Sequence, residues 1–203
     1  GALNQNTTGA SNTAVGRDAL ENNTTADNNT ACGSFTLQDN TTGTANVAIG
    51  KNALLSSTTG DFNTAVGTDS LDAVTTGDNN TAVGDRALSA NTTASNNTAF
   101  GGQALFANTT GYNVTAVGAY ALDAHTTGNN NTALGYNSLT TLTTGYANVG
   151  VGSGSLQDAT TAANCTVVGH NAGTDVTTAP QSTFIGGYSG FKVTTGSDNT
   201  AIG

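Results

Sequence analysis

The apolar positions of this chain recur with a period of 17 residues from one end to the other. A glycine marks each period, and we count it as position 1 of the repeat. Position 17 is apolar in every unit, position 16 is usually Ala, and position 5 is Leu in ten units and Gly in two. A strict internal period of this kind indicates one supersecondary unit stacked on itself many times. The chain is therefore expected to form twelve coils of 17 residues.

Each coil is predicted to contain short strands separated by turns. Positions 14 to 17 read Asn-Thr-Ala-Val in the unit that ends at Val83, and such a β-branched segment closed by glycine is typical of a strand. No apolar stripe with the helical period occurs, so helices are not expected. Seventeen residues allow two short strands and two turns. We predict an all-β parallel β-solenoid, or β-roll, as a single repeat domain over residues 1–203, roughly 57 Å long at about 4.8 Å per coil.

Glycines at positions 1 and 11 are expected at corners of the coil, where the backbone is crowded or φ is positive. Position 11 is Gly or Ala in every unit, so that corner is expected to tolerate a Cβ atom. Position 1 is glycine throughout. The glycines assigned to this structural corner are Gly16, Gly33, Gly50, Gly67, Gly84, Gly101, Gly118, Gly135, Gly152, Gly169 and Gly186.

The pattern also predicts which side chains are buried. Positions 15 and 17 lie on the same side of a strand and accept apolar residues, so we expect them to line the coil. In the two units without Leu at position 5, position 16 is larger: Val167 precedes Gly173, and Phe184 precedes Gly190. Such volume-conserving exchange indicates a shared packed space. Position 16 should therefore be buried too, against a partner outside the coil, and we expect parallel copies to pack about a threefold axis.

Composition narrows the classes of function. The net charge is −9, only 8% of residues are charged, and no basic stripe is present, so nucleic acid is not an expected partner. No run of 18 apolar residues occurs, and a membrane span is not expected in this segment. The chain opens in mid-repeat, lacks Met and shows no capping motif at either end. We expect it to be an excerpt of a longer fibrous chain.

The two cysteines are predicted to stay unpaired within the chain. Cys32 lies at position 17 and Cys165 at position 14 of a coil eight units further on. At about 4.8 Å per coil they are roughly 38 Å apart, far beyond the reach of a disulfide. We expect Cys32 to be a core hydrophobe and Cys165 to replace Asn in its row. A bridge between symmetry-related copies is the alternative.

No catalytic, cofactor or metal site is expected. His125 and His170 lie at positions 8 and 2 of different coils without a matching set of ligands, and we interpret them as solvent-facing loop residues. Carboxylates at positions 12 and 13 form no repeated calcium-binding motif and are interpreted as separate loop residues. These carboxylates are Asp27, Asp61, Asp78 and Asp198. The chain is therefore not expected to be an enzyme.

Threonine and asparagine offer candidate surface features. Positions 9 and 10 are Thr in all twelve units, which we interpret as a structural hydroxyl ladder with at most one outward row, because neighbouring strand residues face opposite sides. An outward threonine array that binds ice is the alternative. Asn-x-Thr sequons are common in so Asn- and Thr-rich a chain. The candidate glycosylation sites among them are Asn6, Asn40, Asn91 and Asn108.

Aromatic residues occupy variable positions, often near the predicted turns. We interpret them as packing over loop backbone, with adhesive contacts as the alternative. These residues are Phe35, Phe62, Phe106, Tyr112, Tyr120, Tyr136, Tyr146, Tyr188 and Phe191.

The repeat resembles two known kinds of surface repeat. The segments N-T-A-V-G-D-R-A-L (Asn80 to Leu88) and N-T-A-L-G-Y-N-S-L (Asn131 to Leu139) are similar to the head repeats of trimeric autotransporter adhesins, whose motif is N-S-V-A-I-G-x-x-S. They are closer to N-T-A-x-G-x-x-A-L-x-x-x-T-T-G repeats that precede intramolecular-chaperone domains of the endosialidase type in phage tail fibres and bacterial surface proteins. The resemblance implies a trimeric, left-handed parallel β-roll exposed outside the cell or on a virion. Thr at position 15 and the fixed period depart from the adhesin motif.

We therefore expect a non-enzymatic extracellular structural or adhesive fibre segment, located on a cell surface or a virion. Self-association as a homotrimer or filament is the expected partnership, and a host-surface or glycan receptor is the expected class of ligand for an adhesive head. A phage tail-fibre shaft is the alternative within the same physical class. An ice- or glycan-binding β-solenoid is the alternative from a different class.

Overall fold

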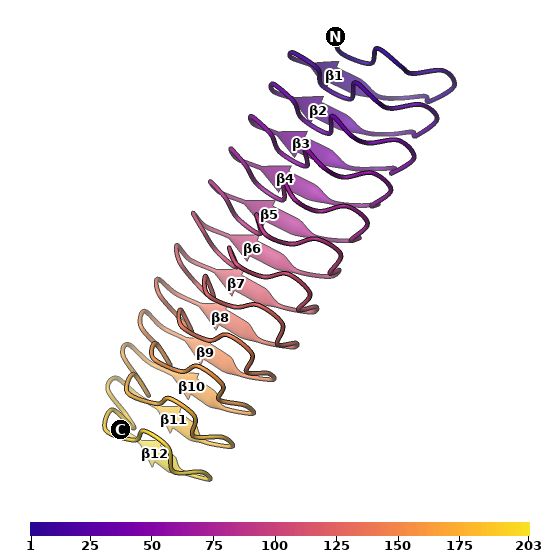
Figure 1. The fold of residues 1–203 in the computed structure, drawn as a ribbon. Coiled ribbons are helices and arrows are strands. Elements are labelled where there is room, and N and C mark those ends of the chain that lie inside the picture. The colour runs from indigo at the N-terminus through magenta and orange to yellow at the C-terminus, as the bar shows by residue number, and fades with distance from the viewer.

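The computed structural model describes residues 1–203 as a rod of stacked coils (Figure 1). Twelve three-residue strands form one parallel sheet in the order of the chain, and no helix is present. The predicted all-β parallel solenoid with a 17-residue period is confirmed. The strands are β1 (Thr13–Val15), β2 (Thr30–Cys32), β3 (Val47–Ile49), β4 (Thr64–Val66), β5 (Thr81–Val83), β6 (Thr98–Phe100), β7 (Thr115–Val117), β8 (Thr132–Leu134), β9 (Val149–Val151), β10 (Thr166–Val168), β11 (Thr183–Ile185) and β12 (Thr200–Ile202).

Equal repeat positions lie side by side in neighbouring coils. Each strand pairs with the next at an offset of 17 residues, so that Thr81 pairs with Thr98 and Ala82 with Ala99. Because no unit has an insertion or deletion, every side chain keeps its direction from coil to coil. Each repeat position therefore forms a row of side chains that runs along the rod.

Each coil contains one strand, whereas the sequence pattern predicted two. The wall opposite the sheet consists of turns, because positions 3 and 5 adopt left-handed backbone angles there, as in Asp18 with a φ of 56° and Leu20 with a φ of 50°. An extended strand does not include such angles. The turns are nevertheless bonded between coils: of 125 backbone hydrogen bonds, only 22 lie within the strands. One example joins Leu88 N–H to the Ala104 carbonyl at 3.0 Å.

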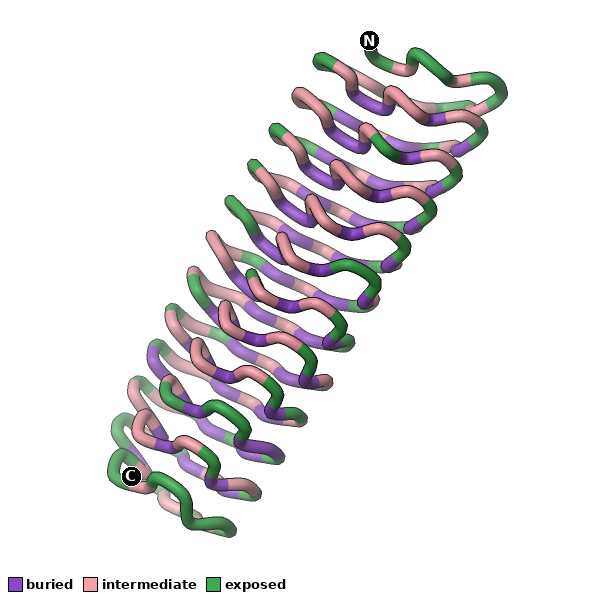
Figure 2. The backbone as a smooth tube through the Cα atoms, in the orientation of Figure 1, coloured by how far each residue is buried: buried purple, intermediate pink, exposed green.

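The interior is a row of leucines facing a row of alanines. The position-5 leucines come from the turn wall and the position-16 residues from the sheet, and members of both rows such as Leu88 and Ala82 are fully buried. Figure 2 shows the buried segments recurring at the same places in successive coils. A large side chain on one wall leaves room for only a methyl group on the other. The expectation that position 16 packs against a partner outside the coil is therefore wrong.

Positions 15 and 17 point outward, which reverses the predicted faces. Val15 is 59% exposed and Phe100 is 56% exposed, although both are strand residues. Because successive strand residues alternate between the two sides of a sheet, burying position 16 turns positions 15 and 17 to the outside. The second apolar surface inferred from the sequence exists, but position 17 forms it.

Position 1 favours glycine for two reasons. At Gly84, φ is +135°, an angle that residues with a Cβ atom rarely adopt. A Cβ atom there would also lie 2.5 Å from the carbonyl oxygen of Gly101, the equivalent residue of the next coil. Position 11 has no positive φ, and Ala26 occupies it without that strain.

Candidate functional surfaces

The outer face of the sheet carries two uncharged rows. Position 15 supplies Thr in ten strands and Val in two, and position 17 supplies an apolar side chain in every strand. Charged residues occur at neither position. The larger side chains of the position-17 row that are well exposed are Val15, Ile49, Phe100, Leu134, Val168, Ile185 and Ile202. This apolar row extends over the whole length of the rod.

Cys32 belongs to this outward row and is exposed, so its predicted place in the core is wrong. Cys165 is buried and takes the place of Asn in the position-14 row, as predicted. Its backbone N–H donates to Asn148 Oδ1 at 3.0 Å, and its thiol lies 3.1 Å from the Ala179 carbonyl oxygen. Burial raises the pKa of the Cys165 thiol. Both cysteines are free.

The two threonine rows differ in their surroundings. At position 9 the hydroxyl donates to the position-9 carbonyl of the next coil, as from Thr41 to Thr58 at 3.0 Å. The next residue, Thr42, is exposed. The interpretation of Thr-Thr as a structural ladder with a single outward row is confirmed, with position 10 forming the outward row.

Two asparagine ladders run inside the rod. At position 14, Asn46 Nδ2 donates to the Gly60 carbonyl at 2.8 Å, and its Oδ1 accepts the Asn63 backbone N–H at 2.8 Å. At position 8, Asn40 Nδ2 donates to Asn23 Oδ1 at 2.9 Å and to the Gly43 carbonyl at 3.0 Å. These bonds satisfy most of the polar groups that the narrow interior separates from water. Asn40 Oδ1 is an exception, because it is buried without a hydrogen-bond partner where Ser57 replaces Asn in the next coil.

The sequons chosen as candidate glycosylation sites lie in the position-8 row. Asn40, Asn91 and Asn108 are fully buried. Asn6 is half-buried, and its Nδ2 donates to the Gly9 carbonyl at 2.9 Å. A glycan on a buried amide nitrogen would displace these bonds and would find no space within the coil. The folded rod therefore does not accommodate glycosylation at Asn40, Asn91 or Asn108.

His125 is buried in the same position-8 row, so its interpretation as a solvent-facing residue is wrong. Its Nδ1 lies 3.1 Å from Asn108 Oδ1, and its Nε2 lies 3.1 Å from Asn131 Nδ2. Because the amide nitrogen is a donor, Nε2 accepts and the ring proton resides on Nδ1. Burial lowers the pKa of His125 to about 4. The neutral ring thus links Asn108 of the position-8 row to Asn131 of the position-14 row.

His170 is exposed, as predicted, and its ring packs edge-on against Tyr188 with centroids 5.5 Å apart. The sequence placed the two histidines in different coils, and the structure separates them further by placing one inside the rod and one outside. Neither has a set of neighbouring acidic or thiol ligands: no three His, Cys, Asp or Glu side chains lie together in a way that could hold a metal ion.

Three of the loop carboxylates share a structural role, so their interpretation as separate loop residues is wrong. Asp61 Oδ1 accepts the Thr44 backbone N–H at 2.6 Å, and Asp78 Oδ1 accepts the Asp61 backbone N–H at 2.8 Å. Asp27 does the same for Ala10 at 2.6 Å. All three occupy position 12, whereas Asp198 occupies position 13 and is exposed. The sequence does contain a signal for this role, because residues with a side-chain oxygen recur at position 12. Ser95 is another example, and its hydroxyl accepts the Asp78 backbone N–H.

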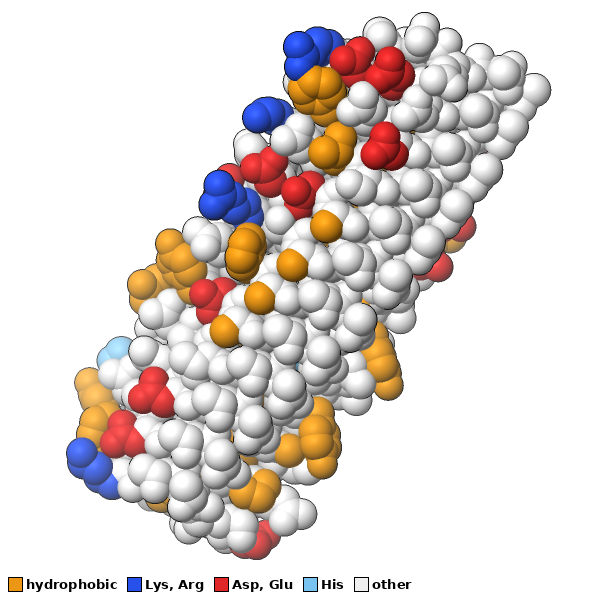
Figure 3. All heavy atoms as spheres, in the orientation of Figure 1, with side chains coloured by type: hydrophobic (Ala, Val, Ile, Leu, Met, Phe, Trp, Pro, Cys, Tyr) orange, Lys and Arg blue, Asp and Glu red, His pale blue; other side chains and the backbone are white.

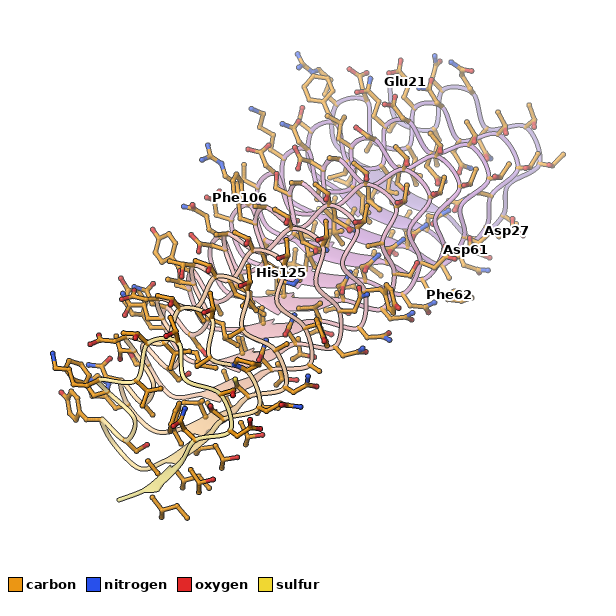
Figure 4. All side chains as sticks on the ribbon, turned by 60° about the horizontal axis from the view of Figure 1, so that its bottom comes forward. Glu21, Asp27, Asp61, Phe62, Phe106 and His125 are labelled. Carbon is orange, nitrogen blue, oxygen red and sulfur yellow. The ribbon has the colours of Figure 1, made fainter.

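Exposed aromatic side chains lie mostly on the turns and corners rather than on the sheet. Tyr120 and Tyr136 form an edge-to-face pair with centroids 6.1 Å apart and planes at 89°. In Figure 3, hydrophobic side chains gather in separate clusters along both long edges of the rod, with a line of small hydrophobic side chains between them. Figure 4 places Asp27, Asp61 and Phe62 along one edge and Phe106 on the opposite one.

The comparisons with known proteins return no relative. The chain matches no protein-family model, no curated protein sequence and no solved structure. No pocket is present on the rod, and the structure contains no helix long and apolar enough to cross a membrane. The most distinctive surfaces of the rod are the outward sheet face and the aromatic clusters.

Proposed function

We propose that this chain is a non-enzymatic structural and adhesive segment of an extracellular fibre, and that it associates with copies of itself through the outer face of its sheet. The observation that carries the proposal is the apolar position-17 row, whose side chains are exposed or half-buried on the outer face from β1 to β12. The resemblance of the repeat to adhesin heads and tail-fibre repeats supports a place on a cell surface or a virion.

A second copy of the chain fits this face better than an unrelated partner. The row repeats once per coil, at about 4.8 Å, and a surface with the same spacing matches it along its full length. The face has no charge at positions 15 and 17, so the net charge of −9 places no like charges within the contact. Large exposed apolar stripes are uncommon on monomers and mark interaction sites. Three parallel copies about one axis are the arrangement that the resemblance implies.

Light scattering coupled to gel filtration tests the association. We expect the chain to elute with three times its own mass. Val83→Asp together with Val117→Asp puts charge into the position-17 row and should give the monomer mass. The matched control is Thr76→Asp on the exposed position-10 row, which should leave the trimer intact. A wild-type monomer at moderate concentration would overturn the proposal.

A phage tail-fibre shaft is the closest alternative, since it uses the same rod and the same contact face. The sequence that flanks this segment distinguishes the two. A C-terminal β-barrel anchor indicates an adhesin, whereas a chaperone domain with a virion-attachment segment indicates a fibre. Electron microscopy of the intact particle gives an independent answer.

Ice binding is a second candidate because the outer face carries two regular rows. Position 15 contributes hydroxyl groups, and position 17 contributes mostly aliphatic groups two residues away, roughly 6.6 Å further along the strand. The adjacent threonines at positions 9 and 10 give a single outward row, whereas positions 15 and 17 of the strands give two outward rows on one face. Thermal hysteresis measures it. Thr81→Tyr should abolish the effect and Thr76→Tyr, in the same coil but off the sheet, should retain it; an absence of hysteresis in the wild type removes this candidate.

A further inference from the structure

We propose that Tyr120, Tyr136 and Asp123 form an open binding platform for uncharged oligosaccharides on the turn side of the rod. The inference rests on the adhesive part of the proposed function, because it names the class of ligand that an adhesive segment would hold. It uses a surface separate from the sheet face, so both can operate in one assembly.

The two tyrosines present a corner of aromatic surface. Their rings stand at 89° to each other with centroids 6.1 Å apart, and Tyr136 is 55% exposed. A pyranose ring carries a patch of C–H groups on one face, which packs against an aromatic face while its hydroxyl groups stay in water. Such a contact needs a flat or angled surface and no cavity, which matches a rod without pockets.

Asp123 supplies directional hydrogen bonding beside the rings. Its Oδ1 accepts the Thr140 hydroxyl at 2.7 Å, and that hydroxyl also lies 3.0 Å from the Tyr120 carbonyl oxygen. Thr140 therefore ties the carboxylate of one coil to the backbone of the aromatic corner. The other oxygen of Asp123 has no partner within the chain and is available to accept sugar hydroxyls.

Phe106 extends the platform toward the N-terminus. It occupies position 6 one coil before Asp123, about 4.8 Å away along the rod, and is partly exposed. A linear oligosaccharide lying along the rod would pass from the tyrosine corner over Asp123 to Phe106. The surface thus has room for more than one sugar ring.

Local charge selects an uncharged ligand. The three coils that form the platform, residues 101–151, contain no Lys or Arg and a single acidic residue, Asp123. Sialic acids, uronic acids and sulfated sugars would meet a carboxylate with no cation to offset it. Neutral hexoses meet no such repulsion.

A comparison within the chain argues against simple packing as the role of these rings. The guanidinium of Arg17 lies 4.2 Å from the ring centroid of Phe35, so that aromatic residue is covered by its own neighbour. No cation covers Tyr120 or Tyr136, which pair with each other and are 38% and 55% exposed. Their outer surfaces face solvent and are free to contact a ligand.

Titration calorimetry on the full chain tests the platform with cellohexaose, maltohexaose, mannohexaose and chitohexaose, and with hexagalacturonate as the anionic comparator. We expect at least one neutral hexasaccharide to bind. Tyr120→Ala and Tyr136→Ala should each weaken that binding about tenfold. Asp123→Asn should weaken it less. The matched control is Phe62→Ala, an exposed aromatic residue on the opposite edge, which should leave binding unchanged.

Three outcomes would overturn the platform: no neutral hexasaccharide binds at concentrations on the order of 10 mM, hexagalacturonate binds more tightly than all of them, or Phe62→Ala weakens binding as much as Tyr136→Ala. Thermal unfolding of each variant checks that these surface changes leave the fold intact. The mass measurement separates the two proposals. A trimer that binds no sugar retains the fibre proposal alone, whereas a monomer that binds sugar retains the platform and removes the trimer.

Discussion

The ring of Phe184 occupies the space that a side chain at Gly190 would need. A Cβ atom at Gly190 would lie 2.5 Å from Cδ1 of that ring, and one at Gly173, a coil earlier, would lie 3.0 Å from Cδ2. One phenylalanine thus fills the volume that two position-5 leucines take in other coils. The two glycines have φ angles of 65° and 58°, close to those of the leucines they replace.

This exchange predicts a compensating pair of substitutions. Phe184→Ala should lower the free energy of unfolding by about 3–5 kcal/mol, because it leaves a cavity. Gly190→Leu alone should also destabilise, since its side chain collides with the ring. Combining them restores a Leu–Ala arrangement at Gly190 but leaves the space beside Gly173 unfilled, and the double variant should be more stable than Phe184→Ala. Thermal and denaturant unfolding measure this, and a purely additive double variant would contradict the shared space.

The corner glycines predict a sharp contrast between repeat positions 1 and 2. Gly84→Ala should destabilise the rod by at least about 2 kcal/mol, because the Cβ atom combines a strained φ with a collision against the next coil. Gly102→Ala is the matched control, since a Cβ atom there has nothing within 4 Å. Its stability should be unchanged or slightly raised. Equal effects of the two substitutions in chemical denaturation would contradict the crowded-corner explanation.

His125 predicts a loss of stability in acid. Its pKa is about 4 in the fold and about 6.5 when unfolded, so the unfolded chain binds the extra proton between these values. The contribution of the neutral ring is complete above about pH 6.5 and is lost as the pH falls toward 4, by on the order of 3 kcal/mol. His125→Asn, which keeps the amide ladder, should lose less stability over this range. Denaturant titrations of the wild type and the variant at pH 7.5 and pH 4 measure how much unfolding free energy each loses in acid. An equal loss in both proteins would contradict the role of His125.

The two cysteines predict different thiol reactivity. Cys165 is buried with a raised pKa, so it should stay unmodified by a maleimide until the rod unfolds. Cys32 stands on the proposed contact face and should react readily in the dissociated Val83→Asp, Val117→Asp variant and slowly in the trimer. Mass spectrometry of labelled peptides measures both. Rapid labelling of Cys165 in the native protein would show that its coil opens.

The structure reverses the predicted orientation of the strand. The sequence pattern is equally compatible with either of its two faces pointing inward. Positions 15 and 17 are apolar or β-branched and alternate with position 16, so alternation alone defines two faces without saying which is inside. Leu88 settles the matter, because its side chain reaches across the narrow interior and leaves room only for Ala82. The same exchange of Leu for Gly, with Phe184 as the compensating residue, was visible in the sequence and located the buried row correctly.

His125 and the position-12 carboxylates show why the polar interior was harder to predict. Histidine is intermediate in its tendency to be buried, so its identity alone does not place it inside. The missed signal was the alignment of the repeats, because position 8 is apolar in five units: Val74, Leu142, Ala159, Val176 and Val193. His125 bonds to Asn108 of the preceding coil and to Asn131 of its own coil. Asp61 likewise acts on the backbone of the preceding coil. Such roles arise only when the coils are stacked.

The sequence by itself determines the repeat, its parallel stacking and its rows of side chains. A period without insertions makes every coil the same length, so equal repeat positions stack on one another. It also identifies the glycine corner and the unpaired cysteines, which follow from spacing along the rod. Only the tertiary structure determines which wall each row faces. That depends on the left-handed turn that carries Leu88 inward, on the narrow space it fills, and on the contacts between coils that no single 17-residue unit contains.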